Sequence, residues 1–244
     1  MSLRLIAVSA LVAGLGLGGA VIPGLCTESD APAQPVPRAV AMTTEQSQTA
    51  PEFAGISNWF NSQPLKLADL RGKVVLLDFW TFCCINCLHV LDELRPLEEE
   101  FADVLVTVGV HSPKFEHEAD PDALAAAVER YAIEHPVLDD PELTTWQAYS
   151  ARAWPTLVVV DPEGYIAAHL SGEGHVAGLY GLVRELVAEH EAKGTLHRGS
   201  GPYVPPAPVA RDLSFPGKAV SLGGRGSRPG TFLVSDTGHH RLLE

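Results

Sequence analysis

Three cysteines within five residues, Cys83, Cys84 and Cys87, are the residues of this chain whose type and spacing predict chemistry. The 244-residue chain has only four cysteines, so they do not form a framework of structural disulfides. Cys84 and Cys87 make a CxxC pair (CINC), whose two thiols can close and open a disulfide. The spacing predicts thiol redox chemistry, which requires no cofactor.

The segments around this pair are expected to place it at the start of a helix. Residues 74–80 are an apolar run that predicts a buried strand, and from Cys87 to Phe101 the apolar residues recur with helical spacing. Unpaired amides and the positive end of the dipole at a helix N-terminus favour a thiolate. We therefore expect Cys84 to attack a disulfide and Cys87, one turn further in, to resolve the mixed disulfide. Pro96 predicts a kink in this helix.

Asp78 is the one charged residue in the predicted strand. Strand alternation puts it on the same face as Leu76 and Trp80. If this face carries the helix with Cys87, burial would raise the pKa of Asp78 and let it exchange protons with Cys87. The alternative is an aspartate at a strand edge that points to solvent. We predict the buried, catalytic role.

The run DFWTFCCINC (residues 78–87), followed by a helix, resembles the strand, CxxC turn and first long helix of the thioredoxin superfamily. The run AWPT (153–156), ahead of the strand LVVVD, resembles the cis-proline loop of that superfamily, which lies against the active cysteines. The resemblance covers residues 52–194. It implies an α/β thioredoxin-like fold and a cis bond between Trp154 and Pro155. It also implies that these two residues bind the extended chain of a substrate, with protein thiols or disulfides as partners.

Two residues depart from the family pattern. Cys83 stands where many relatives have Trp, and Asn86 stands where thioredoxin has Pro. Because of these two differences, the reduction potential of the Cys84–Cys87 pair does not follow from the resemblance. The choice between reductase, oxidase and isomerase therefore stays open. Cys83 itself is expected to be a small, buried hydrophobic residue.

The rest of the pattern predicts the remaining elements of such a fold. Residues 104–110 are β-branched and predict a strand parallel to the first. Pro121 is expected to open a helix, which together with a short strand at 136–140 resembles the insertion of the TlpA/redoxin branch. Further expected elements are a short N-terminal hairpin (58–60 with 64–67), a helix at 142–150, strands at 156–160 and 166–170, and a helix at 176–193 that ends at Gly194.

The two ends of the chain differ in composition from the centre. Residues 1–25 are apolar and predict a signal peptide or membrane anchor, and residues 26–51 a disordered linker. The protein is then expected to be extracytoplasmic and, in the second case, tethered to a membrane. If translation starts at Met42, it would instead be cytoplasmic. Residues 52–195 are expected to form the thioredoxin-like domain.

A second resemblance begins after a Pro/Gly-rich linker at 196–208. FPGK (215–218) and DTGHHR (236–241) resemble the opening of an NHL repeat, a blade of a β-propeller. The order of these segments closely resembles that of NHL-repeat-containing thioredoxin-like proteins. One blade cannot close a ring, so we expect 209–244 to be an incomplete repeat of a truncated product.

Other function classes are less well supported by the residues. The net charge of −13 argues against nucleic acid as a partner. Cys83 and Cys87 also form a CxxxC pair that suits Cu(I) or Zn, so a copper-binding or metallochaperone-like protein is an alternative. No histidine has a fixed spacing to the cysteines, and we predict no metal ligands. The candidates would be His89, His111, His169 and His175. A further alternative is a non-enzymatic scaffold that carries an NHL propeller, and peroxidase chemistry is a third option, for which Thr81 alone is thin support.

Overall fold

The computed structural model describes residues 48–203, 213, 215–222, 231–239 and 241–243. The predicted signal peptide or anchor, and nearly all of the predicted linker at 26–51, lie outside these residues. Within the described residues, no helix is long and apolar enough to cross a membrane.

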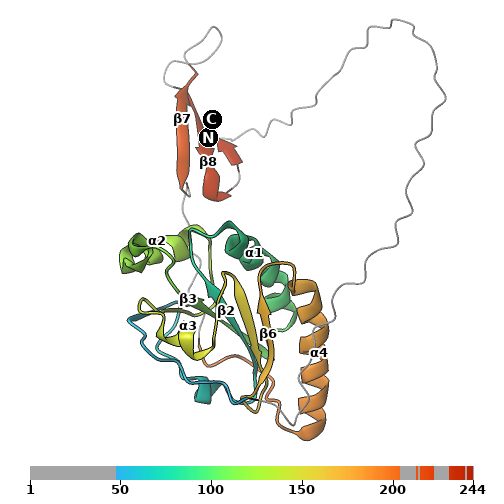
Figure 1. Ribbon diagram of the computed structural model, residues 1–244. Helices are drawn as coiled ribbons and strands as arrows, with labels where there is room; N and C mark the ends of the chain where they lie inside the picture. Colours follow the sequence, from blue (N-terminus) through green and yellow to red (C-terminus); the bar gives the residue numbers. More distant parts are fainter. Residues whose placement is uncertain (1–47, 204–212, 214, 223–230, 240, 244) are drawn as a thin grey trace, which may run out of the picture. The chain divides into compact units, whose positions relative to one another are not determined.

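The domain is built on a six-stranded mixed sheet with the strand order β1-β4-β3-β2-β5-β6 (Figure 1). At its centre, β2 pairs in parallel with β3 and antiparallel with β5. Every residue of β2 and β3 is buried, which explains why both sequences are nearly continuous apolar runs. The strands are β1 (Asn58–Phe60), β2 (Val74–Trp80), β3 (Leu105–His111), β4 (Val137–Asp139), β5 (Thr156–Val160) and β6 (Ile166–Ser171).

Helices cover both faces of this sheet (Figure 1). On one face, α1 and α4 pack their apolar sides on alternate residues of β2 such as Leu76. On the other face, Trp146 and Tyr149, in and just after α3, pack on Phe79. The helices are α1 (Ile85–Glu100), α2 (Pro121–Arg130), α3 (Thr144–Ala148) and α4 (Val176–Lys193), with 3-10 turns at Leu67–Leu70 and Glu116–Ala119.

Most of the predicted elements are confirmed, and with them the α/β thioredoxin-like fold. Pro121 is the first residue of α2. Gly194 ends α4 with a φ of 73°, a left-handed conformation that glycine adopts readily. The strand pair at 156–160 and 166–170 forms around the expected turn. Pro96 lies inside α1, which continues to Glu100.

The predicted N-terminal hairpin is wrong. β1 pairs antiparallel with β4, more than seventy residues later in the chain, and not with residues 64–67. The segment after Pro64 instead turns into the 3-10 helix Leu67–Leu70, both of whose end residues are buried. The Glu52 carboxylate accepts hydrogen bonds from the amides of Leu67 (2.6 Å) and Ala68 (3.1 Å). The Glu52 carboxylate therefore satisfies the amides at the start of the 3-10 helix, which have no partner within that helix.

The C-terminal residues that are described form a separate antiparallel sheet, β7-β8-β9. Its strands are β7 (Pro216–Ser221), β8 (Phe232–Asp236) and β9 (Arg241–Leu243). Three short antiparallel strands are consistent with part of a propeller blade, as predicted. Apolar side chains stay exposed on it, among them Val220, Phe232 and Leu242. The predicted boundaries of the domains are not tested by these strands.

Candidate active site

Cys84 is the N-cap residue of α1, at the junction of β2 and the helix where the sequence predicted it. Its backbone is extended (φ −101°, ψ 106°), and its sulfur accepts a hydrogen bond from the amide of Cys87 at 3.4 Å. Its carbonyl accepts the amides of Cys87 and Leu88, which are the first bonds of the helix. The Sγ atom therefore faces the unpaired amides at the helix N-terminus.

The two cysteines of the pair have very different surroundings. Both are free thiols, but Cys84 is half-buried and Cys87 is completely buried. Burial raises the pKa of Cys87 far above its usual range, and the hydrogen bond with Cys84 and the charge of Asp78 act in the same direction. Of the two thiols in the pair, Cys84 is therefore the reachable one, and Cys87 is protonated at neutral pH.

The loop before β5 lies against Cys84. The Trp154–Pro155 peptide bond is cis, as the resemblance predicted. The carbonyl of Trp154 lies 3.7 Å from the Sγ of Cys84, within hydrogen-bond distance of a thiol. The Trp154 ring stacks on Trp146, with centroids 4.2 Å apart, and its Nε1 donates to the carbonyl of Ser112 at 2.8 Å. Both contacts hold the loop in place.

Asp78 is fully buried, and neither of its carboxylate oxygens has a hydrogen-bond partner. It lies on the face of β2 that α1 covers, because Leu76 and Trp80 on either side of it pack against residues of α1. Burial raises the pKa of Asp78 to about 7; His135 opposes this rise and Glu98 adds to it. This face of the sheet therefore carries the helix with Cys87, which the sequence alone left open.

Glu118 is a site residue that the sequence did not reveal. Its side chain is buried, and its carboxylate accepts hydrogen bonds from the Thr81 hydroxyl, the Cys83 amide (2.9 Å) and the amides of Lys114 and Phe115 (2.9 Å each). Burial raises the pKa of Glu118, but these hydrogen bonds more than offset it, so the pKa lies below its usual range. Ionised Glu118 thus ties the entry of the CxxC turn to the loop after β3.

The predicted burial of Cys83 is wrong. The side chain is exposed, because β2 ends at Trp80 and the chain has already turned away from the core. Its Sγ lies 3.4 Å from the Nε2 of His117, which was not among the histidines considered as metal ligands. Each of those four makes its polar contact elsewhere, with Glu173, Asp139, the Tyr149 carbonyl and the Ser171 carbonyl.

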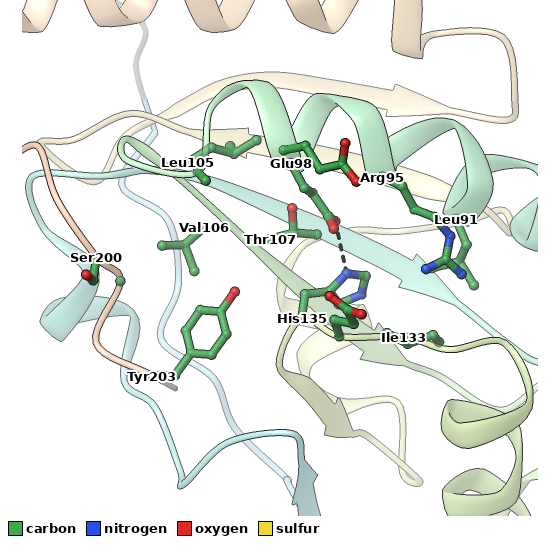
Figure 2. Close-up of a pocket in the computed structure, with 14 residues that line it drawn as sticks. Leu91, Arg95, Glu98, Leu105, Val106, Thr107, Ile133, His135, Ser200 and Tyr203 are labelled. Atoms are coloured by element: carbon green, nitrogen blue, oxygen red, sulfur yellow. Dashed lines mark hydrogen bonds and ion pairs between the residues drawn. The ribbon is translucent and has the colours of Figure 1, made fainter. Parts of the chain in front are cut away.

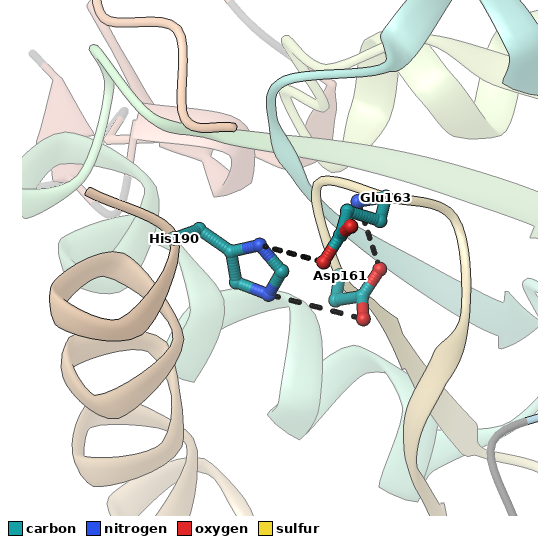
Figure 3. A group of neighbouring side chains, drawn as sticks. All are labelled: Asp161, Glu163 and His190. Atoms are coloured by element: carbon teal, nitrogen blue, oxygen red, sulfur yellow. Dashed lines mark hydrogen bonds and ion pairs between the residues drawn. The ribbon is translucent and has the colours of Figure 1, made fainter. Parts of the chain in front are cut away.

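One group of ligand-type side chains is found elsewhere in the described residues. Asp161, Glu163 and His190 have ligand atoms within 4.8 Å of one another, where α4 ends beside the turn between β5 and β6 (Figure 3). The imidazole already has a partner at Nδ1, the Thr195 hydroxyl at 2.8 Å, and Lys193 lies 3.3 Å from Glu163. These contacts describe a structural ion-pair cluster that holds the end of α4.

Comparison with known proteins supports the thioredoxin-like fold. A family model described as thioredoxin-like matches residues 72–166. NHL repeat-containing protein 2 of Gallus gallus is 40% identical over 209 residues, which are 82% of this chain and 28% of that protein. Thiol-disulfide oxidoreductase YkuV of Bacillus subtilis is 24% identical over 144 residues, 59% of this chain and 97% of that protein.

A solved structure gives the same result for the fold. The crystal structure of a thioredoxin-like superfamily protein is 32% identical, with a TM-score of 0.54, and the match covers 57% of this chain and 96% of that one. By contrast, the chain spans only about a quarter of the length of its NHL-repeat relative. The activity of that longer protein as a whole is therefore not assigned to this chain.

Proposed function

The chain belongs to the thioredoxin-like family, whose members include thiol–disulfide oxidoreductases, and we propose that it catalyses thiol–disulfide exchange on protein substrates. One observation carries the proposal: the two cysteines of the CxxC pair are unequal. Cys84 is reachable at the helix N-terminus beside the Trp154 carbonyl, whereas Cys87 is buried next to an acidic group. Such a division is what attack followed by resolution requires.

The proposed reduction of a substrate disulfide has two steps. The Cys84 thiolate attacks one sulfur of the substrate disulfide, a mixed disulfide forms, and the other substrate sulfur leaves as a thiolate. The Cys87 thiol then gives its proton to the Asp78 carboxylate and attacks the sulfur of Cys84. The Cys84–Cys87 disulfide closes, the second substrate thiolate leaves, and two electrons have passed to the substrate. Oxidation of a substrate dithiol is the reverse sequence.

The proposed substrate is a protein in extended conformation. Trp154 and Pro155 line the approach to Cys84, and their backbone is where the substrate chain would lie. Two large apolar side chains stay exposed near the cysteines. Ile85, which follows Cys84 in the chain, is 62% exposed, and Phe115, which stacks on His117 beside Cys83, is 50% exposed. Exposed apolar groups around a reactive thiol suit contacts with a peptide.

Trapping of the mixed disulfide tests the proposal. Cys87→Ser removes the resolving thiol, so the variant should accumulate mixed disulfides through Cys84 with a disulfide-containing protein such as oxidised insulin. Cys84→Ser should trap almost none, and Cys83→Ser is the matched control that should trap none but turn over normally. Mixed disulfides that map to Cys83 or Cys87, or none in the Cys87→Ser variant, would refute the assignment.

The cellular location stays a prediction that rests on the apolar pattern of residues 1–25. We propose that this segment exports or tethers the protein. Fractionation of cells that express the full chain, compared with a chain that starts at Met42, tests it. Full-length protein in the cytosolic fraction, with residues 1–41 retained, would contradict the proposal.

A further inference from the structure

Asp78 lies next to a group of buried polar atoms around Gly109. Its neighbour across the parallel pair with β3 is Gly109, so no side chain covers it from that strand. A Cβ atom placed on Gly109 would lie 3.0 Å from the Nε1 of Trp80 and 3.1 Å from the Nε2 of His135. Both nitrogens, and the Cγ2 of Val137 at 3.2 Å, therefore lie against the backbone of Gly109, where a larger residue would collide with them.

These atoms are buried without a hydrogen-bond partner in the protein. They are the two carboxylate oxygens of Asp78, the Nε1 of Trp80, the Nε2 of His135 and the Oγ1 of Thr107. Buried polar groups of folded proteins are hydrogen-bonded either to protein atoms or to ordered water. Ordered water between Asp78 and the nitrogens of Trp80 and His135 would satisfy these atoms and bridge one group to the next.

His135 links this group of atoms to the surface. Its Nδ1 lies 2.9 Å from the Oε1 of Glu98, and the side chains of the two are 6% and 25% exposed. Figure 2 shows the pair at the wall of a cavity of about 440 Å³, with Thr107 beside it and Arg95 and Tyr203 further out. Because Glu98 is partly exposed on α1, it can exchange protons with solvent.

The proposed reaction needs such a connection. Asp78 and Cys87 are both completely buried, and all of β2 is buried with them. A proton that Asp78 takes from Cys87 must leave before the next turnover.

We propose that His135 and Glu98 relay the proton of Asp78 to solvent. The inference rests on the proposed thiol–disulfide exchange. The neutral Asp78 carboxyl gives its proton, through bridging water, to the Nε2 of His135. The resulting imidazolium passes the proton on its Nδ1 to the Glu98 carboxylate, which releases it to solvent. His135 returns to its neutral form and Asp78 is again a carboxylate.

The two chemical steps can be followed separately with a small aromatic disulfide as the substrate. Each half of this substrate absorbs light when it is released as a thiolate. With the full chain in which Cys26 and Cys83 are Ser, the first absorbance phase reports attack by Cys84. The second phase reports closure of the Cys84–Cys87 disulfide. Glu98→Gln should slow the second phase about tenfold or more and leave the first within about twofold, by analogy with the loss of other acid–base groups. Glu99→Gln, which removes the same charge from the same cavity wall, should change neither phase.

Gly109→Ala tests the position of the two nitrogens and leaves every titratable group in place. The added methyl meets the Trp80 and His135 nitrogens at 3.0 and 3.1 Å, which is tighter than ordinary contact, so it must displace them from their positions beside Asp78. It too should slow only the second phase.

His135→Ala distinguishes a relay from a structural contact. Its slowed second phase should be restored, with saturation, by added imidazole, which can take and give protons in the vacated cavity. Pyrazole has the same shape but is far less basic, and should not restore it. A wild-type second phase in Glu98→Gln or His135→Ala, or equal effects of imidazole and pyrazole, would overturn the relay. Absence of a first phase in the parent chain would instead overturn the proposed function.

Discussion

Replacing Asp78 with Asn should make the protein more stable in a way that depends on pH. Burial raises the pKa of Asp78 from its ordinary value of 3.8 to about 7 in the folded protein. The folded state therefore binds the proton more tightly than the unfolded state. The stability that this adds is fully present below pH 3.8 and is lost as the pH rises toward 7.

The size of the effect follows from the difference between the two pKa values. One pKa unit corresponds to about 1.4 kcal/mol, so the wild type should lose about 4 kcal/mol of unfolding free energy between pH 4 and pH 8 through this group alone. Asp78→Asn cannot titrate. A buried amide adds its own cost, but that cost is the same at every pH.

Urea unfolding of both proteins across this pH range, under reducing conditions, measures the effect. A reductant is needed because a Cys84–Cys87 disulfide would remove the Cys87 thiol that lies beside Asp78. Carboxyls that do not interact with Asp78 titrate equally in both proteins, so the difference between the two unfolding free energies reports Asp78 together with the groups coupled to it, His135 and Glu98. A difference that stays constant from pH 4 to pH 8 would show that Asp78 is not a buried, protonatable group, and would refute its proposed role as the base.

Three further predictions concern the surroundings of the cysteines. Asp78→Asn should slow the second absorbance phase about a hundredfold, flatten its pH profile near pH 7 and leave the first phase unchanged; equal slowing of both phases would contradict this. Glu118→Ala should lower the unfolding free energy by about 3 kcal/mol in urea melts, because it leaves the Thr81 hydroxyl and three amides unpaired. As a control, Glu116→Ala at an exposed position should change the unfolding free energy by less than about 0.5 kcal/mol. Phe115→Ser should raise the KM for oxidised insulin several-fold but leave the reaction with the aromatic disulfide unchanged; a common effect on both would speak against a peptide contact.

Local patterns predicted the parts of the fold that local interactions build. The apolar run of β2, the helix start at Cys84 and the helix end at Gly194 each depend on residues within one or two turns. The partner of β1 could not be predicted in this way. The three residues of β1 carry little preference for one pairing partner. Their partner β4 is brought near only by the fold of the whole domain.

The same distinction holds within the site. The CxxC pair, Asp78 and the cis-proline loop were visible as motifs. Glu118 contacts Thr81 across 37 residues, and His135 contacts Glu98 across 37 residues. A glutamate near the start of a short helix suggests a cap, but nothing in the sequence indicates which distant hydroxyl it would also bind. Contacts of this kind follow from the packing of α1 and the loop after β3 against the end of β2.

Burial of Asp78 serves two requirements that oppose each other. A base is most effective at neutral pH when its pKa is near 7, and burial is what raises the pKa of this carboxyl to that value. The same burial separates the carboxyl from the solvent with which it must exchange protons. In the proposed relay, His135, which contacts Glu98, meets the second requirement without undoing the first, because it passes protons while Asp78 stays buried. The lowered stability expected above pH 4 is then a direct consequence of having a base in the core.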